Sequence, residues 1–467
     1  MERRPVFFLI AFLSVVGFAE GADVATRSSV TFSRDIAPIF YQHCVNCHRP
    51  NSIAPMSLLT YRQARPWAAS IRDAVKTRRM PPWSADPNVN TYANDPRLND
   101  AELAALIAWT NNGAPEGDPN DMPRQPTFTD NWTLGTPDVI LAFGEEQTIS
   151  QNDEDEYVNI ELPTNFTEDK WVQAVDIRPG NRKIVHHATV SIIPRRPAGQ
   201  QSSSLSSSYT YREGKLEFIK PDMFVADNGC AFPDGGDWPG TAARHQLGGN
   251  GSDLGSFLPG RGPDIRPEGY AVLVPAGSIL NFQMHYTKTK IVEKDRSSIG
   301  LYFLKGPLKA QVHHAEIWNR LFKIPPRASN HEVTSCSTVD RDVEFLAYTA
   351  HMHFRGKDMK SEAVYPDGRR EVIFSVPRYS FNWQQLYTLK TPKFMPKGTV
   401  VKTTAHFDNS PNNPQNPDPS DTVRWGQPSR AEMMGFWVDL LMPESVSEES
   451  FLIPAATLSA VQRRYVP

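Results

Sequence analysis

Five consecutive residues near the start of the chain have the order and spacing of a haem-attachment motif. They are Cys44, Val45, Asn46, Cys47 and His48. In such a run the two thiols form thioethers with the porphyrin vinyl groups, and the following histidine binds the iron. A redox dithiol and half of a zinc site are the alternatives, but the adjacent histidine and the lack of a second cysteine pair disfavour both. The motif therefore predicts covalent haem c on Cys44, Cys47 and His48.

The sixth iron ligand has to reach the haem face opposite His48. Met80 precedes two prolines, which restrict the backbone and favour an extended loop that holds the thioether in place. Met56 is the alternative ligand, and either methionine could instead fill the core. His43 adjoins the motif and is badly placed to reach the far face. We expect Met80 to complete the iron coordination.

Further along the chain, five histidines and one methionine form a second candidate constellation: His186, His187, His285, His351, His353 and Met433. Residues i and i+2 of a strand point to the same face, so His351 and His353 can converge on one metal. Adjacent His186 and His187 point to opposite faces of an ideal strand, so joint ligation requires a bulge or different ring nitrogens. Taken singly, each residue has an ordinary structural role as its alternative.

The order of these residues resembles the type II copper, ascorbate-dependent monooxygenases, the family of peptidylglycine α-hydroxylating monooxygenase and dopamine β-hydroxylase. The resemblance covers residues 132–442. Its matching segments are Val185–His187, Gln283–Tyr286, Ala350–Lys357 and Ala431–Met434. The resemblance implies two copper ions, of which the electron-transfer copper would lie on His186, His187 and His285.

By the same resemblance, an oxygen-binding catalytic copper would lie on His351, His353 and Met433. A soft thioether favours Cu(I), the oxidation state that meets oxygen. Met434 directly follows Met433, which leaves the sulfur ligand uncertain by one position, and we favour Met433. The chain lacks a clear counterpart of the family's substrate-carboxylate arginine, so the substrate is left open as a small organic molecule or a peptide.

The gap between His187 and His285 is longer than is usual in that family, and Ser- and Gly-rich loops over residues 200–262 account for it. We interpret these loops as a surface insertion, with an active-site lid as the alternative. Cys230 and Cys336 are the cysteines outside the haem motif, and they form either one disulfide or two free thiols.

Two other histidine positions lie outside the matching set. His313 and His314 form a second adjacent pair, and His406 falls in a strand of the same region. We expect all three to be structural.

Helical patterns are expected to position the haem motif within a small all-α domain over residues 27–113, which resembles a class I cytochrome c. The expected elements are a first helix capped by Ser33 or Asp35, a second over residues 61–79, and a third that begins at Asn99–Asp100 and stops at Gly113. Residues 114–130 are rich in Pro, Asp and Gln without an apolar period, which predicts a linker.

Short β-type runs separated by turn residues are expected to position the histidines. Examples are Val139–Leu141, Tyr157–Ile160, Ile184–Ile193, Leu280–Tyr286, Glu344–Tyr348, Arg370–Ser375 and Gly435–Leu441. They predict two all-β, jelly-roll-like sandwich domains over residues 131–299 and 300–460. The fold class is therefore a multidomain chain with a small helical domain followed by two β-sandwiches.

The first 19 residues combine a basic start, an apolar run and small residues at a cleavage position, which predicts a signal peptide and a periplasmic or secreted protein. An uncleaved membrane anchor is the alternative, but the run is shorter than a span of about 20 residues. No later segment is long enough to cross a membrane. With a formal net charge of −3, the chain lacks the excess of Lys and Arg that binding to nucleic acid or to an anionic membrane surface requires.

Together these features predict an enzyme, a copper-dependent monooxygenase that hydroxylates a C–H bond with O₂. The fused haem would deliver electrons from an external donor, either ascorbate or a redox protein. The alternatives are a non-catalytic haem and copper electron-transfer protein, and a cytochrome joined to a surface-binding β module.

Overall fold

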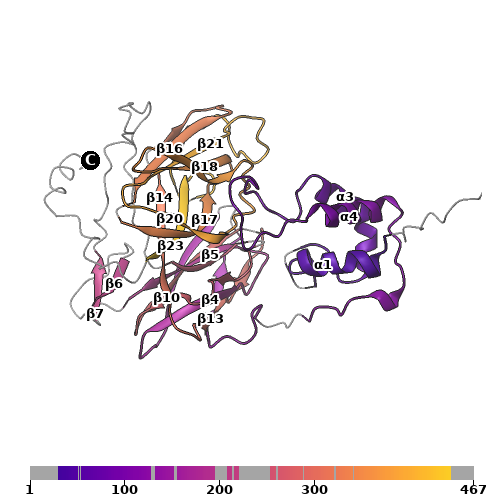
Figure 1. The fold of residues 1–467 in the computed structure, drawn as a ribbon, viewed down its shortest axis with the longest axis horizontal. Helices are drawn as coiled ribbons and strands as arrows, with labels where there is room; N and C mark the ends of the chain where they lie inside the picture. The colour runs from indigo at the N-terminus through magenta and orange to yellow at the C-terminus, as the bar shows by residue number, and fades with distance from the viewer. Residues whose placement is uncertain are drawn as a thin grey trace, which may run out of the picture.

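The computed structural model has a helical domain beside a large β region (Figure 1). It describes residues 30–127, 132–194 and 253–442, apart from positions 51, 53, 152–154, 259–260, 288, 320–321, 340 and 427, and the backbone of two short strands within 208–219. The expected signal peptide, Cys230 and most of the loops at 200–262 lie outside the described residues. Within the described ranges, no helix is long and apolar enough to span a membrane.

The helical domain packs three short helical stretches around one apolar core. Its elements are η1 (Phe32–Ile36), α1 (Ala37–His43), α2 (Tyr61–Ala64), η2 (Arg65–Trp67), α3 (Ala68–Lys76), α4 (Asp100–Asn111) and η3 (Pro119–Asp121). The core is built around Phe32, Phe40 and Trp109, which are fully buried with ring centroids about 6 Å apart. The expected small helical domain is confirmed.

The start of the first helix differs from the expectation. Thr31 occupies the cap position, and its N–H donates to Asp35 Oδ2 at 2.8 Å. Ser33 is buried and donates to the Glu116 carbonyl at 3.0 Å. Ser33 therefore joins the helix to a later segment and does not cap it.

The other two helical stretches follow the expected capping chemistry more closely. The second ends at Lys76 and not at residue 79, because Arg78 adopts a φ of 56°, the left-handed conformation that terminates helices. The third begins with a capping box between Asn99 and Glu102, and Gly113 follows it with a φ of 83°.

The β region consists of two units in chain order. The first contains β1 (Val139–Ala142), β2 (Gln147–Ile149), β3 (Glu156–Pro163), β4 (Lys170–Arg178), β5 (Val185–Ile193), β6 (Ser208–Arg212), β7 (Lys215–Ile219), β8 (Asp253–Phe257), β9 (Asp264–Ile265), β10 (Tyr270–Val274), β11 (Ile279–Tyr286), β12 (Glu293–Asp295) and β13 (Ser298–Phe303). The second contains β14 (Ala310–Trp318), β15 (Lys323–Ile324), β16 (His331–Thr338), β17 (Val343–His351), β18 (Gly356–Val364), β19 (Arg370–Val376), β20 (Tyr387–Met395), β21 (Val400–Phe407), β22 (Val423–Arg424) and β23 (Gly435–Met442).

Each unit has its own apolar core between two sheets. In the first unit the sheets are β1-β13-β4-β10 and β3-β11-β5-β8, and in the second they are β14-β23-β17-β20 and β16-β21-β18-β19. Strands β10 and β14 pair in parallel, so one sheet continues from the first unit into the second. The expected boundary between residues 299 and 300 falls inside β13, which pairs with β1 and β4 and thus lies in the first unit.

Residues 83–94, here named the strap, leave the helical domain and pack on the second β unit. Trp83 and Tyr92 are buried, with ring centroids 4.7 and 5.6 Å from that of Tyr387. The Asp86 N–H donates to the Ser375 carbonyl at 2.9 Å. The strap therefore attaches the helical domain to the core of the second unit.

Candidate metal centres

A β-bulge brings the first three histidines together. His187 on β5 lies directly opposite His285 on β11, and the register then shifts so that Tyr286 pairs with Val185. The extra residue is His186. Side chains of neighbouring residues normally alternate between the two faces of a strand, so the bulge is what allows His186 and His187 to reach one site. This is the irregularity that the adjacent pair required.

The spacing of the three rings fits a chelated metal ion. Their ligand atoms all lie within 4.8 Å of one another. His187 Nδ1 is 3.4 Å from His186 Nδ1 and 3.2 Å from His285 Nδ1. Nitrogens bound tetrahedrally at about 2.0 Å from a metal lie about 3.3 Å apart. The three side chains can therefore share one ion without rearrangement.

Burial favours the neutral form of two of these imidazoles, His186 and His187. It lowers the pKa of His186 to about 4 and that of His187 well below its ordinary value, and the nearby His285 lowers both further. Metal binding requires the unprotonated ring, because its lone pair forms the bond. The site is thus prepared for a metal at neutral pH.

Asp155 orients the third histidine. Its Oδ2 lies 2.9 Å from His285 Nε2, and this hydrogen bond lowers the pKa of the Asp155 carboxyl. The Tyr157 ring stacks on His285 with centroids 4.3 Å apart. Because Nε2 is engaged, Nδ1 of His285 is the nitrogen that faces His187. A carboxylate partner of this kind fixes the tautomer and direction of a metal-binding histidine.

The second set gathers where two paired strands meet. His351 is the last residue of β17 and lies opposite Gly435, the first residue of β23. The preceding loop residue Met433 places its Sδ 3.2 Å from His351 Nε2. The rings of His351 and His353 have centroids 5.3 Å apart, although His353 lies beyond the end of the strand. The two rings converge as expected, but His353 does so from the irregular segment between the end of β17 and the turn at Phe354–Arg355.

Buried acceptors hold both rings of the second set. Gln384 Oε1 lies 2.7 Å from His351 Nδ1, and the Ala431 carbonyl lies 3.2 Å from His353 Nδ1. Each Nε2 is then the nitrogen left for a ligand. Burial lowers the pKa of His351 to about 4 and that of His353 to about 3, so both are neutral. Two imidazoles and a thioether form a donor set that suits a soft ion such as Cu(I).

Glu432 ties the loops of the second set together. Its fully buried carboxyl accepts the N–H of His353 at 2.8 Å and that of Arg355 at 2.6 Å. Burial raises the pKa of this carboxyl to about 8, and the two hydrogen bonds oppose the shift. Glu432, Gln384 and Asp155 were missed by sequence analysis, because they support the histidines from distant or irregular parts of the chain. The one available signal was that Glu432 adjoins Met433.

One aromatic ring contacts a histidine of each set. Phe381 stacks on His186 with centroids 4.8 Å apart, and its edge faces His353 at 5.8 Å. The first set comes from the first β unit and the second set from the second unit. Both donor groups therefore border the same junction, with Phe381 in contact with both.

The neighbouring residues that the sequence left as alternatives lie elsewhere. Met434 is fully buried in the core of the second unit, whereas Met433 reaches His351. His314 Nδ1 is 2.8 Å from Asp439, and His406 Nδ1 is 2.6 Å from Asp358. Within the described part of the chain, the metal-binding group of His, Cys and acidic residues is the set at 186, 187 and 285. His313 belongs to neither set.

The haem-attachment residues follow helix α1. Cys44 and Cys47 are free thiols, and His48 Nδ1 lies 3.3 Å from the Met56 carbonyl, which leaves Nε2 to bind iron. These donors fit a covalent haem. Burial raises the pKa of Cys47, and the nearby positive charge of Arg182 opposes that rise. Arg182 lies shortly before β5, which carries His186.

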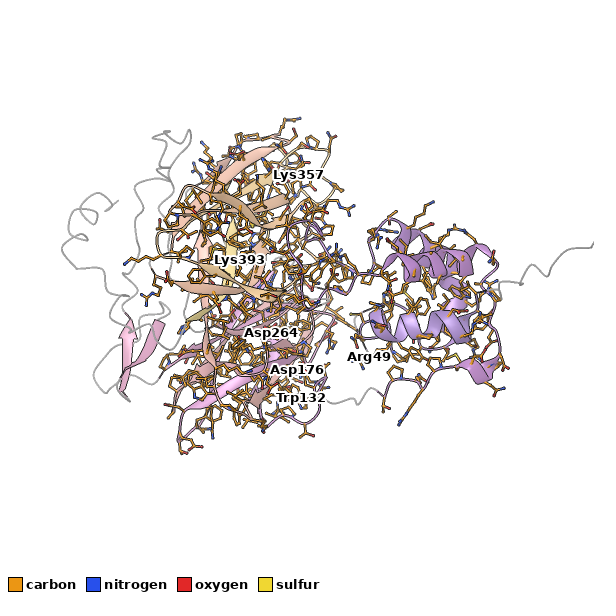
Figure 2. All side chains as sticks on the ribbon, viewed as in Figure 1. Arg49, Trp132, Asp176, Asp264, Lys357 and Lys393 are labelled. Carbon is orange, nitrogen blue, oxygen red and sulfur yellow. The ribbon has the colours of Figure 1, made fainter. Side chains whose placement is uncertain are left out.

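The residue that follows the haem-attachment motif lies on the side of the helical domain nearest the β region. Arg49 lies on the side of the helical domain that faces the β region (Figure 2), and its charge interacts with that of Arg182. Met80 is half-buried shortly before the strap, and Met56 packs against the helical core. The burial of Met80 and Met56 does not distinguish which of them binds the iron, so Met80 as the sixth ligand stays a prediction. Cys336 is buried and disulfide-bonded, while its expected partner Cys230 lies outside the described residues.

Comparison with known families identifies the helical domain. The model of the family described as cytochrome c matches residues 34–113. Residues 34–113 are a cytochrome c domain. The domain implies a covalent haem c and electron transfer through it, as the Cys44–His48 motif predicted. No family match supports the resemblance of the β region to copper monooxygenases.

Comparison with solved structures adds no argument about the β region. A Paenibacillus xanthan lyase is 9% identical with a TM-score of 0.15, over 72% of this chain and 29% of that one. The chain thus spans less than a third of the length of that lyase. A structure of infectious bursal disease virus, Gt strain, is 8% identical with a TM-score of 0.16, over 72% of this chain and 88% of that one. The search of curated proteins finds no match.

Proposed function

We propose that the chain is a periplasmic or secreted copper-dependent monooxygenase that hydroxylates a C–H bond with O₂ and draws electrons through its cytochrome c domain. The observation that carries the proposal is the gathering of two donor sets around Phe381. One set offers three imidazoles, and the other offers two imidazoles and the thioether of Met433. The two β units would then be jelly-roll-like sandwiches.

The reaction has a definite balance. One oxygen atom enters the substrate C–H bond and the other leaves as water, which consumes two electrons and two protons from outside the substrate. Copper held by His186, His187 and His285 and by His351, His353 and Met433 would supply electron storage and the site of oxygen reduction. A small organic molecule or a peptide is the substrate class that the resemblance to this enzyme family favours.

The chain's own residues prepare both sets for this role. Asp155, Gln384 and the Ala431 carbonyl engage one nitrogen of His285, His351 and His353 and leave the other free. Burial keeps His186, His351 and His353 unprotonated, so these three rings have no proton to lose when a metal binds.

The position of the cytochrome domain supports electron delivery to the first set. Cys47 lies within electrostatic range of Arg182, which stands shortly before His186 in the chain. The strap attaches the same domain to the second unit through Trp83 and Tyr92. The haem would pass electrons to the histidines of the first set, and ascorbate or a redox protein would reduce it from outside.

The test is oxygen consumption by protein that carries haem and copper. With a reductant and a panel of small organic and peptide substrates, we expect substrate-dependent oxygen uptake, and labelled oxygen should appear in the product mass. Met433→Ala is the matched variant for loss of turnover, and Met434→Ala is its control. Copper binding without substrate-dependent uptake would favour a non-catalytic electron-transfer protein. No copper binding would leave a cytochrome with a surface-binding β module.

A further inference from the structure

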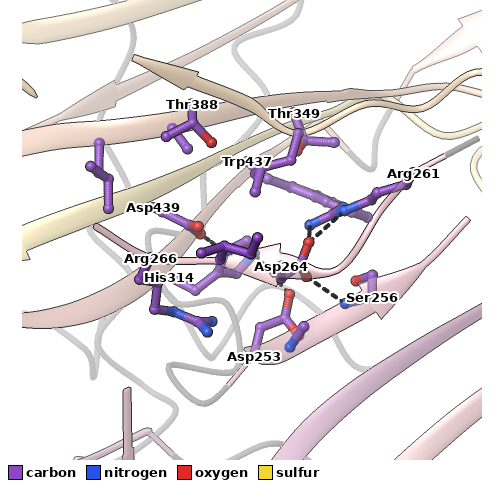
Figure 3. Close-up of a pocket in the computed structure, with 15 residues that line it drawn as sticks. Asp253, Ser256, Arg261, Asp264, Arg266, His314, Thr349, Thr388, Trp437 and Asp439 are labelled. Carbon is purple, nitrogen blue, oxygen red and sulfur yellow. Dashed lines mark hydrogen bonds and ion pairs between the residues drawn. The ribbon is translucent and has the colours of Figure 1, made fainter. Parts of the chain in front are cut away.

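A charged cavity lies between the two β units, apart from both donor sets. It is lined by residues of β8, β9, β14, β17, β20 and β23 (Figure 3). Three of its lining residues are carboxylates, Asp253, Asp264 and Asp439, and three are cations or potential cations, Arg261, Arg266 and His314. Charged side chains are rarely buried unless they are paired, so the partners of each one show what the cavity is built to hold.

Two of the carboxylates are already neutralised by neighbours. Asp264 accepts hydrogen bonds from Arg261 Nε at 2.8 Å and from the Ser256 N–H at 2.8 Å. Asp439 lies 2.8 Å from His314 Nδ1. In these contacts, drawn in Figure 3, Arg261 pairs with Asp264, and the Nδ1 of His314 pairs with Asp439.

The donors that remain belong to Arg266 and His314. Arg266 is 7% exposed, and its Nη2 donates to the Leu254 carbonyl at 2.8 Å. Its Nε and Nη1 are buried and have no hydrogen-bond partner among the described residues. The Nε2 of His314 is also buried without a hydrogen bond, although Asp253 and Glu316 each place a carboxylate oxygen 3.9 Å from it. A buried donor that stays unsatisfied destabilises the fold, and more so when the group is charged. Such donors gathered around one cavity indicate a ligand that accepts hydrogen bonds.

We propose that this cavity binds a carboxylate group, either of a small organic acid or at the end of a longer molecule. Arg266 and His314 would donate to its oxygens. The cavity has room for about one or two water-sized groups, which suits a carboxylate better than a bulkier anion. A phosphate would also bring a second negative charge beside Asp253, Asp264 and Asp439.

Asp253 makes the site tolerant of one added negative charge. Burial raises the pKa of its carboxyl to about 6, and the positive charge of His314 opposes that rise. A bound carboxylate next to Asp253 would favour the protonated form of Asp253 further, which limits the repulsion. A metal ion is the poorer occupant, because the carboxylates at 264 and 439 are engaged by cations and the remaining donors are N–H groups.

The cavity is distinct from the candidate copper ligands but touches their surroundings. Trp437 lines the cavity, and its ring stacks on His351 with centroids 4.9 Å apart. A molecule anchored here would therefore lie across Trp437 from the second donor set. The binding proposal uses none of the six donor residues, so it stands or fails independently of the copper proposal.

The test uses the full haem-loaded chain and ligand-observed NMR with acetate and propionate, with acetamide as the neutral isostere and inorganic phosphate as the dianion. We expect acetate or propionate to bind, and acetamide and phosphate to bind at least roughly ten-fold more weakly. Arg266→Gln should weaken acetate binding by roughly ten-fold or more, while Arg62→Gln, an exposed arginine of the helical domain, should leave it unchanged.

His314→Gln is the second variant, in case Arg266→Gln does not fold because it loses the bond to Leu254. It removes the charge and the free Nε2 donor, and it should also weaken acetate binding roughly ten-fold. Circular dichroism melting would check each variant's fold. Equal binding of acetate and acetamide by the parent, no binding of either acid, or parental affinity in both folded variants would overturn the proposal.

Discussion

Gln384 offers a direct way to perturb the second donor set without touching a proposed ligand. Its Oε1 lies 2.7 Å from His351 Nδ1, and both residues are buried. Gln384→Leu keeps a similar side-chain volume but removes the acceptor for His351 Nδ1 and the Nε2 donor to the Phe381 carbonyl at 3.1 Å. The His351 ring then loses its fixed direction, and a buried N–H and a buried C=O are left unsatisfied. Loss of such a partner typically weakens metal binding 10- to 100-fold, which corresponds to about 1.4–2.7 kcal/mol.

The assay is a Cu(I) competition titration against a chromophoric chelator, in a His285→Ala background that weakens the first set. Gln385→Leu is the matched control, because Gln385 is also buried but makes no side-chain hydrogen bond to a described residue. We expect a 10- to 100-fold loss of affinity for Gln384→Leu and less than about 3-fold for Gln385→Leu. The unfolding free energy of Gln384→Leu should also fall by about 1–3 kcal/mol. Parental Cu(I) affinity in folded Gln384→Leu would refute the role of Gln384 in orienting His351.

Three further predictions concern separate parts of the molecule. Met433→Ala should retain nearly normal Cu(II) binding but weaken Cu(I) binding, because a thioether contributes mainly to the reduced ion; equal loss of both would contradict the donor assignment. Met80→Ala should abolish the methionine–iron charge-transfer absorption of the oxidised haem while Met56→Ala keeps it, and the reverse pattern would move the ligand to Met56. For His314, burial alone would lower the pKa, but the hydrogen bond to Asp439 and the charge of Asp253 outweigh burial and raise it to about 9. Because the folded pKa exceeds the unfolded value of about 6.5, the stabilisation by His314 is complete below that pH and is lost as the pH rises through about 9. Urea unfolding of parent and His314→Gln should therefore converge at high pH, and a constant difference would exclude this titration.

Local chemistry made the helical domain predictable. The Asn99 capping box and Gly113 are recognisable in sequence because capping depends on adjacent residues. The end of the second helix was missed because it depends on the left-handed backbone at Arg78. Arginine has no particular preference for that conformation, so the sequence gives no sign of it. The single sheet that joins the two β units rests on the long-range pairing of β10 with β14, which no local pattern encodes.

The candidate site also has features that local sequence patterns predicted and features that they could not predict. The alternation of strand side chains predicted that His186 and His187 share a site only through a bulge or through different ring nitrogens, and the register shift shows the bulge. The roles of Asp155 and Gln384 depend on contacts across the fold, so sequence spacing carried no information about them. Phe381 and the strap were missed for the same reason.

The copper-to-iron ratio of the haem-loaded, copper-reconstituted chain tests the central claim most directly. Elemental analysis after removal of loosely bound metal should give about two copper ions per haem iron in the parent, and about one when His285→Ala or His351→Ala disables one set. His406→Ala is the control, because His406 pairs with Asp358 outside both sets, and it should keep the parental ratio. A parent without retained copper, or a ratio unchanged by His285→Ala and His351→Ala, would contradict the assignment of two copper sites.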